Sequence, residues 1–435
     1  MSSSLNTPED PQAPFAPRTP HIIGRQSYID AIRNAITDQT GRSHALYFVG
    51  PGGIGKTRLL EEVAVILQAW TGKSFRRTEI IDLYYAKYHS PGGLREAIAN
   101  GLDPDNDYFQ KYRALRADFE RKRQEGIIGR ELEELRRQFD GVFQQEYSVL
   151  AREQRLVLCF DTLELIQYES DVVQEICRVQ DVDTVIKNWL LEQVSRFPNS
   201  VTLFAGRPRP RVQADFEQGF DRAGCIFTLF ELKAFSQEET ENYLDVMGKV
   251  EPELSRILKP DIQKQVFHIT QGRPIYLSLL IDLLLHGEVL SQIIPISIPA
   301  TEFVDEQLVS QQLVEHLLNL SDPVGQIIYF LLHARKGMDA DLLQYLMGDL
   351  WPRDQVQKNL ELMRQFAFVK ARSDTKQIFL HDEVYDLFDR YFVDDPRFGR
   401  QYESIAQHYR QRLGTAASLE GNEELMVAAL YYELS

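Results

Sequence analysis

The stretch HALYFVGPGGIGKT, residues 44–57, determines the fold expected for this chain. Its first half, HALYFVG, is a short apolar run with aromatic residues, which is typical of a buried strand. Glycines then crowd the next positions, and Lys56 and Thr57 open a segment with helical periodicity. Because glycine adopts backbone conformations that other residues avoid, this order predicts a strand, a tight loop and a helix.

The loop has the spacing G-x-x-x-x-G-K-[ST], in which backbone N–H groups and the positive end of the following helix surround phosphate. Lys56 supplies a mobile charge to the β- and γ-phosphates, and the Thr57 hydroxyl is a hard oxygen ligand for Mg²⁺. We therefore expect the chain to bind a nucleotide together with Mg²⁺. The predicted nucleotide contacts are Gly50, Pro51, Gly52, Gly53, Ile54, Gly55, Lys56, Thr57 and Arg58.

Length and composition narrow the classes of protein further. A chain of 435 residues is expected to form about two to four domains. It is 43% hydrophobic and 26% charged, with no apolar run long enough for a membrane span and no secretory signal at its start, so we expect a cytoplasmic protein with no membrane partner. Its three cysteines show no C-x-x-C spacing, which argues against a zinc site. The net charge of −16 argues against nucleic acid as a partner.

The fold class follows from further apolar runs that alternate with helical patterns. Strand-like runs cover residues 78–85, 155–161, 200–206 and 225–230. Continuous apolar strands separated by helices predict an α/β fold with a doubly wound parallel sheet. About seventy residues separate the second strand from the third, far more than a simple crossover needs. Two amphipathic patterns in this gap predict a helical insertion at about 86–153.

The remaining boundaries follow from changes in the pattern. Residues 1–20, with proline at every third position from Pro8, are expected to be a disordered or semi-rigid leader before an ATPase domain at 21–230. Ser236 and Glu239 form a predicted capping box that opens an all-α helical domain at 231–300. Helices and a hairpin at 366–381, with its turn at 373–375, predict a winged-helix domain at 301–395. Residues 396–435 resemble the start of α-helical, TPR-like repeats, so we expect the front part of a longer protein.

Two further segments supply candidate catalytic residues. The strand LVLCFD ends in Asp161, an acid placed to act as the partner of Thr57 at Mg²⁺. Glu164 lies three residues later and is the candidate general base, which we favour over the alternative of a surface residue that opens a helix. Arg207 follows the strand SVTLFAG, where a guanidinium can approach the γ-phosphate.

In their order, these motifs resemble the STAND group of P-loop ATPases, which includes the NB-ARC and NACHT families and is related to AAA+ ATPases. HIIGRQ (21–26) resembles the element on the adenine side, which implicates Gly24 and Arg25. TQGRPIYLSLL (270–280) resembles the G-x-P element, which places Pro274 near the adenine. FLHDEVYDLF (379–388) resembles the Met-His-Asp element, whose histidine, here His381, reaches the β-phosphate of ADP.

The resemblance implies a nucleotide-gated signalling switch. It would be closed with ADP, active and homo-oligomeric with ATP, slow in hydrolysis, and governed by a stimulus sensed through the C-terminal repeats. Leu380 and Thr162 depart from the pattern, since the family has methionine and, in many members, a second acid at these positions. Without the resemblance, His381 would be interpreted as a structural histidine. The alternatives are a DNA-binding transcription regulator that uses residues 354–366, and a continuously cycling ATPase.

Overall fold

The computed structural model describes residues 22–68, 75–127, 129–164, 182–293, 306–371, 376–392, 401–415 and 423–434. The predicted leader, the proline-containing segment after Ile293 and the hairpin turn at 373–375 lie outside these ranges. The chain divides into two compact units. The sheet unit holds Arg25–Pro51 and Lys56–Lys233, and the helical unit holds Gly24, Gly52–Gly55 and the described residues from Ala234 onward.

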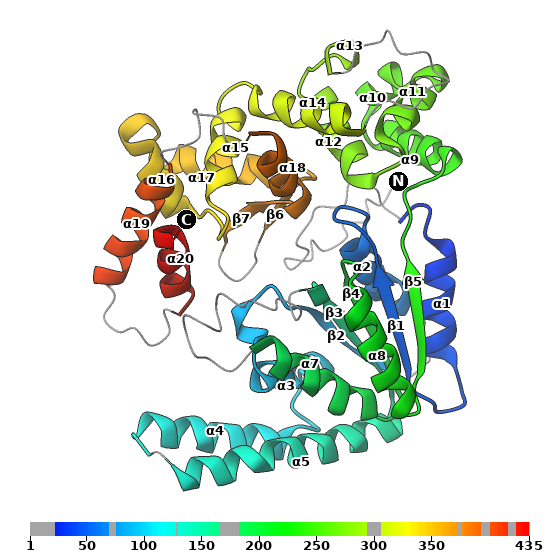
Figure 1. The fold of residues 1–435 in the computed structure, drawn as a ribbon, viewed down its shortest axis with the longest axis vertical. Coiled ribbons are helices and arrows are strands. Elements are labelled where there is room, and N and C mark those ends of the chain that lie inside the picture. Colours follow the sequence, from blue (N-terminus) through cyan, green and yellow to red (C-terminus); the bar gives the residue numbers. More distant parts are fainter. Residues whose placement is uncertain are drawn as a thin grey trace, which may run out of the picture. The chain divides into compact units, whose positions relative to one another are not determined.

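The sheet unit is built on five parallel strands in the order β2-β3-β4-β1-β5 (Figure 1). The strands are β1 His44–Val49, β2 Phe75–Asp82, β3 Arg155–Asp161, β4 Ser200–Gly206 and β5 Ile226–Glu231. The predicted parallel α/β sheet is thus confirmed. Parallel strands end at the same edge, so the segments that follow β1, β3 and β4 meet there.

Helices cover both faces of this sheet. They are α1 Gln26–Thr37, α2 Lys56–Gln68, α3 Pro91–Leu102, α7 Val182–Glu192 and α8 Pro210–Arg222, with short 3-10 turns at Ala86–Tyr88 and Val194–Arg196. Tyr47 of β1 packs against Phe216 of α8, with ring centroids 6.0 Å apart. Its neighbour Phe48 points to the other face and contacts Tyr28 of α1 at 6.3 Å. This alternation explains why the three central strands, β1, β3 and β4, are buried almost along their whole length.

The strand β2 differs from the prediction, which placed it at 78–85. It lies at an edge of the sheet, where charged side chains such as Arg76 and Arg77 are tolerated, so it begins three residues earlier. Its register with β3 shifts between Arg77 and Ile80. At this irregularity the Thr78 hydroxyl accepts the Cys159 N–H at 3.1 Å, which satisfies a buried donor.

The long segment between β2 and β3 contains α3 and two further helices, α4 Gln110–Gln124 and α5 Arg130–Glu153, which lie side by side (Figure 1). Aromatic rings join them. Tyr112 of α4 meets Phe143 of α5 edge-on at 5.2 Å, and Phe119 meets Phe139 at 5.3 Å. The amphipathic spacing seen in the sequence therefore corresponds to a helical pair closed by its own apolar seam.

The helical unit contains α-helices and one antiparallel hairpin. The helices are α9 Gln237–Val250, α10 Pro252–Ile257, α11 Pro260–Thr270, α12 Pro274–Leu285, α13 Leu290–Ile293, α14 Glu306–Leu318, α15 Val324–His333, α16 Ala340–Met347, α17 Arg353–Met363, α18 Asp382–Phe392, α19 Gln401–Thr415 and α20 Glu423–Leu434, with a 3-10 turn at Gly348–Leu350. The hairpin pairs β6 Val369–Ala371 with β7 Ile378–Leu380. The capping box at Ser236 and Glu239 is present, as predicted.

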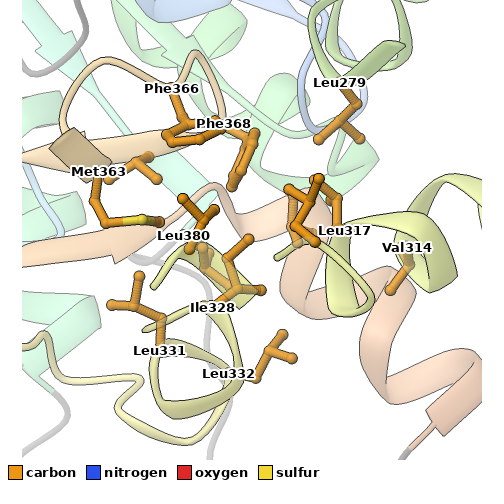
Figure 2. Packing of buried hydrophobic residues seen from close by; sticks show 14 of the residues in the cluster. Leu279, Val314, Leu317, Ile328, Leu331, Leu332, Met363, Phe366, Phe368 and Leu380 are labelled. Carbon is orange, nitrogen blue, oxygen red and sulfur yellow. The ribbon is translucent and has the colours of Figure 1, made fainter. Parts of the chain in front are cut away.

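One apolar cluster holds the helical unit together (Figure 2). Leu279 of α12, Leu317 of α14 and Leu331 of α15 point toward Phe368 and Leu380 at the hairpin. All five side chains are buried. Because residues from Phe235 to Tyr432 share this cluster, α12 and the hairpin are parts of one packed body.

Within the described ranges, no helix combines the length and the apolarity needed to cross a bilayer.

Candidate functional site

The glycine-rich loop lies where the motif predicts it, between the end of β1 and the start of α2. Gly50 N–H donates to the carbonyl of Gly206, the last residue of β4, at 3.3 Å. Gly53 and Gly55 have φ angles of +66° and +93°, which non-glycine residues rarely adopt. A Cβ on Gly53 would also lie 2.5 Å from Ile275 within the helical unit, so no larger residue fits there.

Lys56 lies over this loop. Its Nζ donates to the carbonyl oxygens of Gly50 at 2.9 Å and Pro51 at 2.8 Å. Lysine has three donors on a flexible stem, so it can exchange these carbonyls for phosphate oxygens. Arg58, also predicted as a contact, forms an ion pair with Glu62 at 3.0 Å along α2.

The Thr57 hydroxyl and the Asp161 carboxylate meet directly. Thr57 Oγ1 donates to Asp161 Oδ2 at 2.6 Å, across 104 residues of sequence. The other oxygen, Oδ1, accepts the N–H of Thr162 at 2.8 Å. The structure thus brings together the two residues that the sequence assigns to Mg²⁺.

Asp161 is buried, and burial is the largest of the effects that raise the pKa of its carboxyl to about 6. The negative charge of Asp82 raises this pKa further. The hydrogen bonds from Thr57 and Thr162 and the charge of Lys56 oppose the shift. The ionised form of Asp161 is therefore destabilised in the folded protein. A nearby cation would stabilise it.

Asp82 is a neighbour of the site that the sequence analysis did not select. It ends β2 and is in register with Asp161 on β3. Thr162, at a φ angle of +59°, donates its hydroxyl to Asp82 Oδ1 at 2.5 Å. Thr162, which directly follows Asp161, is thus hydrogen-bonded to an acid from the adjacent strand. The available signal was that TEIID, like LVLCFD, is an apolar strand ending in aspartate.

Glu164 and Arg207, predicted separately as base and sensor, are paired. The Arg207 N–H donates to Glu164 Oε2 at 3.0 Å, and its Nε lies 3.6 Å from Oε1. Their side chains are 16% and 33% exposed respectively, so the pair lies partly open to solvent. A Cβ on Gly206 would come within 3.1 Å of Glu164 Oε2, so glycine makes room for this carboxylate.

Gly24 and Arg25 are both in constrained positions. Gly24 has φ +65°, and a Cβ there would lie 2.8 Å from Glu239 Oε1 within the helical unit. Arg25 is 4% exposed, and its carbonyl accepts the N–H groups of Tyr28 and Ile29 at the start of α1. The small residue and the buried cation are thus fixed by the fold.

Pro274 is the first residue of α12, where its missing N–H costs no hydrogen bond. Two residues earlier, Gly272 has φ +68°, and a Cβ there would lie 2.0 Å from the carbonyl oxygen of Phe235. Glycine is therefore required in this element, and the sharp turn that it forms sets where α12 begins.

His381 lies between β7 and α18 in the helical unit. Its backbone N–H donates to Phe368 O at 2.7 Å, and its Nδ1 accepts the N–H of Glu383 at 3.2 Å. The ring therefore acts as the N-terminal cap of α18. The carboxylate of the next residue, Asp382, pairs with Lys370 of β6 at 2.8 Å.

The residues at the loop fit the groups that the motif implies. Hard oxygen atoms 2.6 Å apart on Thr57 and Asp161 suit Mg²⁺, which usually takes one or two protein ligands and completes its shell with water and phosphate. Accordingly, among the described residues no cluster of three or more His, Cys, Asp or Glu side chains could hold a metal. The positive φ angles of Gly53 and Gly55 suit the backbone curl by which such loops turn their N–H groups toward phosphate.

Neither a family model nor a curated protein matches the chain. Solved structures give distant likenesses. The Aeropyrum pernix ORC2 protein (ADPNP–ADP complexes) is 14% identical, covering 86% of this chain and 94% of that one, with a TM-score of 0.39. The Aeropyrum pernix ORC1 protein in complex with DNA is 12% identical, covering 85% and 93%, with a TM-score of 0.39. Drosophila ORC bound to DNA is 13% identical, covering 88% and 85%, with a TM-score of 0.32.

The comparisons contradict one prediction, that nucleic acid is not a partner, because two of these structures contain DNA. That prediction relied on the net charge of −16, which is a sum over the whole chain. Contact with a phosphate backbone depends instead on the charge of one local surface. The expectation is therefore withdrawn.

Replacing Asp161 by asparagine should stabilise the metal-free protein at neutral pH. A carboxyl whose pKa is raised by folding binds a proton more tightly in the folded state, so its contribution to stability falls as the pH rises from about 4 to about 6. Asp161→Asn should therefore raise the free energy of unfolding at pH 7.5 by about 1–3 kcal/mol. Urea unfolding with a chelator present measures this value.

The gain should shrink as the pH falls below about 6. Glu217→Gln, which changes an exposed acid on α8, is the matched control and should leave stability within about 0.5 kcal/mol. An effect of Asp161→Asn that is equal at pH 4.5 and 7.5 would mean that this carboxyl does not titrate in that range.

Proposed function

We propose that the chain is a nucleotide-gated switch of the STAND type, related to AAA+ ATPases. The observation that carries the nucleotide-binding part is the hydrogen bond between Thr57 and Asp161, 2.6 Å long, beside a loop with the phosphate-binding spacing. Chance placement of a hydroxyl, an acid and a lysine around such a loop is improbable, because Asp161 lies 104 residues from Thr57, which directly follows Lys56.

In this proposal the loop N–H groups, Gly50 to Thr57, and Lys56 hold the phosphates of ATP or ADP. Thr57 and Asp161 hold Mg²⁺, which neutralises charge on the phosphate oxygens when it is bound. Arg207 lies at the end of β4, next to the glycine loop through the Gly50–Gly206 hydrogen bond. In the proposal its guanidinium distinguishes a triphosphate from a diphosphate by charge.

Hydrolysis in this arrangement is slow. Glu164, the proposed base, is held by Arg207, so both of its oxygens have a partner in the structure. Thr162 stands in place of a second acid and is hydrogen-bonded to Asp82. Glu164 must separate from Arg207 before it can accept a proton from water, so it is a poor general base in this arrangement. Slow hydrolysis of this kind is expected of a nucleotide-gated switch rather than of a continuously cycling ATPase.

The switching part of the proposal places Pro274 and His381 at ADP in the closed state. Both residues belong to the helical unit, whose hairpin and preceding helices we interpret as a winged-helix domain. ATP would favour a second state in which this domain moves and homo-oligomers form. A ligand can shift such an equilibrium only through unequal affinity for the two states. The C-terminal helices α19 and α20 would begin the segment that receives the stimulus.

Lys56→Ala should abolish nucleotide retention. The loss of a charge-assisted bond to phosphate should weaken ADP and ATP by about 10- to 100-fold. The measurement is the amount and identity of nucleotide released from the purified protein on denaturation, together with titration of the stripped protein. Lys264→Ala, on the exposed side of α11, is the control. Unchanged affinity in Lys56→Ala would remove the phosphate-loop assignment.

Glu164→Gln should keep nucleotide binding and lower hydrolysis by about 10²- to 10⁴-fold, because a general base is lost. Asp82→Asn is the matched comparison, since Asp82 is the other carboxylate hydrogen-bonded near Thr162. Phosphate release is followed in single and multiple turnovers. Wild-type rates in Glu164→Gln would assign the base elsewhere, and steady multiple turnover by the unstimulated protein would favour a continuously cycling ATPase.

DNA binding is the second candidate function, through α17 and the hairpin that follows it. Lys358 is exposed on this helix, whereas Arg353 and Arg364 pair with Asp341 and Glu361. If this surface meets a phosphate backbone, Lys358→Glu should abolish a gel shift with duplex DNA, and the shift should weaken between 50 and 200 mM salt. The absence of any shift at low salt would exclude this candidate.

A further inference from the structure

The turn after β3 adopts a backbone conformation that its sequence disfavours. Thr162, which directly follows Asp161, has a φ angle of +59°. A β-branched residue rarely adopts this left-handed conformation, and glycine or asparagine would fit there with less strain. Such a conformation persists only where surrounding contacts fix it. The contacts of Thr162 therefore show what this strained turn maintains.

Thr162 bridges two acids from neighbouring strands. Its hydroxyl donates to Asp82 Oδ1 at 2.5 Å, and its backbone N–H donates to Asp161 Oδ1 at 2.8 Å. The two acids are register partners at the ends of β2 and β3. Neighbouring strands lie about 4.8 Å apart, and side chains in register point to the same face of the sheet. A residue that donates to both carboxylates therefore links two like charges that would otherwise lie side by side.

Asp82 is itself fixed, so it can serve as an anchor for this turn. The same Oδ1 atom accepts the Tyr84 N–H at 3.0 Å, and the Asp82 carbonyl accepts the Tyr85 N–H at 3.1 Å. The Leu83 N–H donates to the Asp161 carbonyl at 3.2 Å, so the pairing of β2 with β3 continues one residue past Asp82. These backbone contacts give the Asp82 carboxylate a defined position relative to the end of β3.

The bridge determines which oxygen of Asp161 faces the phosphate-binding loop. Oδ1 accepts the Thr162 N–H, whereas Oδ2 accepts the Thr57 hydroxyl at 2.6 Å. The torsion that rotates a carboxylate is broad, so one donor on each oxygen is what holds it in a single orientation. Without the bond to Asp82, the backbone of Thr162 would relax out of the left-handed region and turn its N–H away from Oδ1. The orientation of Oδ2 toward Thr57 would then no longer be fixed.

The same turn directs the chain from β3 toward β4, which lies on the opposite side of β3 from β2. Leu163 is fully buried. A Cβ on Gly206, the last residue of β4, would lie 3.1 Å from Leu163 Cβ and 3.1 Å from Glu164 Oε2. The side chain of Thr162 is thus bonded to the strand on one side, while the residues that follow it lie against the strand on the other. One hydrogen bond therefore supports the placement of both Asp161 and Glu164.

We infer that Asp82 is a positioning residue for the candidate metal site: through the Thr162 hydroxyl it holds the turn after β3 so that Asp161 presents Oδ2 beside Thr57. The inference rests on the proposed function and adds to that site a residue from outside both sequence motifs. The loop and Lys56 hold the phosphates, whereas the cation depends on Asp161. Breaking the bond between Asp82 and Thr162 should therefore weaken a divalent cation bound with the nucleotide more than it weakens the nucleotide itself.

The test measures two affinities of the full chain after bound nucleotide has been removed. One is the dissociation constant of ADP in the presence of EDTA, and the other is that of Mn²⁺ for the ADP complex, followed by the electron paramagnetic resonance signal of free Mn²⁺. Asp82→Ala and Thr162→Val should each weaken Mn²⁺ about tenfold and metal-free ADP less than about threefold. Equal losses of both affinities, or unchanged Mn²⁺ binding, would overturn the inference.

Conservative variants separate the hydroxyl from the rest of the threonine side chain. Thr162→Ser keeps the donor and should bind Mn²⁺ within about twofold of the wild type. A loss in Thr162→Ser as large as that in Thr162→Val would mean that the bond to Asp82 is not what matters. Thr162→Gly removes the hydroxyl but suits the left-handed backbone, so it replaces Thr162→Val if that variant does not fold, and it should show the same tenfold loss of Mn²⁺ affinity.

Thr78 offers a matched control, because its hydroxyl also links β2 to β3. It accepts the Cys159 N–H at 3.1 Å, and the side chain is buried. Thr78→Val should lower the unfolding temperature and leave the ratio of the Mn²⁺ affinity to the metal-free ADP affinity unchanged. If it changes that ratio as much as Asp82→Ala does, any loosening of these two strands suffices and the specific role of Asp82 is wrong.

A double-mutant cycle tests whether Asp82 acts through Thr162. The variant with both Asp82→Ala and Thr162→Val should lose about as much Mn²⁺ affinity as either single variant, because both remove the same bond. Strictly additive losses would overturn the positioning role. Asp82→Asn keeps an acceptor oxygen for the hydroxyl and should retain most of the Mn²⁺ affinity. A loss as large as that in Asp82→Ala would show that the charge of Asp82 acts directly, which contradicts the inference.

The proposed function and this inference fail in different ways. A stripped wild-type chain that binds neither ADP nor ATP, with or without a divalent cation, would overturn the proposed function itself. A wild-type chain that binds ADP with Mn²⁺ and keeps both affinities in Asp82→Ala and Thr162→Val would overturn only this inference.

Discussion

The contact between Thr57 and Asp161 is the constraint on which the arrangement of the sheet unit depends. It joins the first turn of α2 to the end of β3, although β4 lies between β1 and β3 in the sheet. For a threonine hydroxyl to reach across that strand, the glycine loop must curl tightly, and positive φ angles at Gly53 and Gly55 allow this.

Carboxylates gather at this edge and are each restrained differently. Asp161 is buried beside Asp82, and burial together with this like charge raises the pKa of its carboxyl. Glu164 is instead neutralised by Arg207. A cation would therefore stabilise the ionised form of Asp161, whereas Glu164 already has a cationic partner in Arg207. A polyanionic ligand with a divalent ion would satisfy the first and compete for the arginine of the second.

The sequence predicted what local patterns encode. The central strands β1, β3 and β4 were found because they are apolar runs, and the loop was found because its motif is contiguous. The edge strand β2 was misplaced by three residues, since tolerance of Arg76 and Arg77 depends on sheet order. Asp82 was missed because its value lies in its register with Asp161. Its bond to Thr162 spans 80 residues of sequence, and no short pattern links the two.

Helix α12 shows how polar groups can define geometry that apolar packing leaves open. Its interior is almost uniformly leucine and isoleucine, and nine of its residues are buried. A helix that is apolar on every side can rotate about its own axis and still pack nearly as well. A shift in register of one residue corresponds to a rotation of about 100°. Asp282 lies within this apolar helix, and any such rotation would break its hydrogen bond to the Ala367 N–H. Substitutions that exchange one leucine of α12 for another apolar residue should therefore leave the rotation of the helix about its axis unchanged. The Asp282 carboxylate is the group that fixes this rotation.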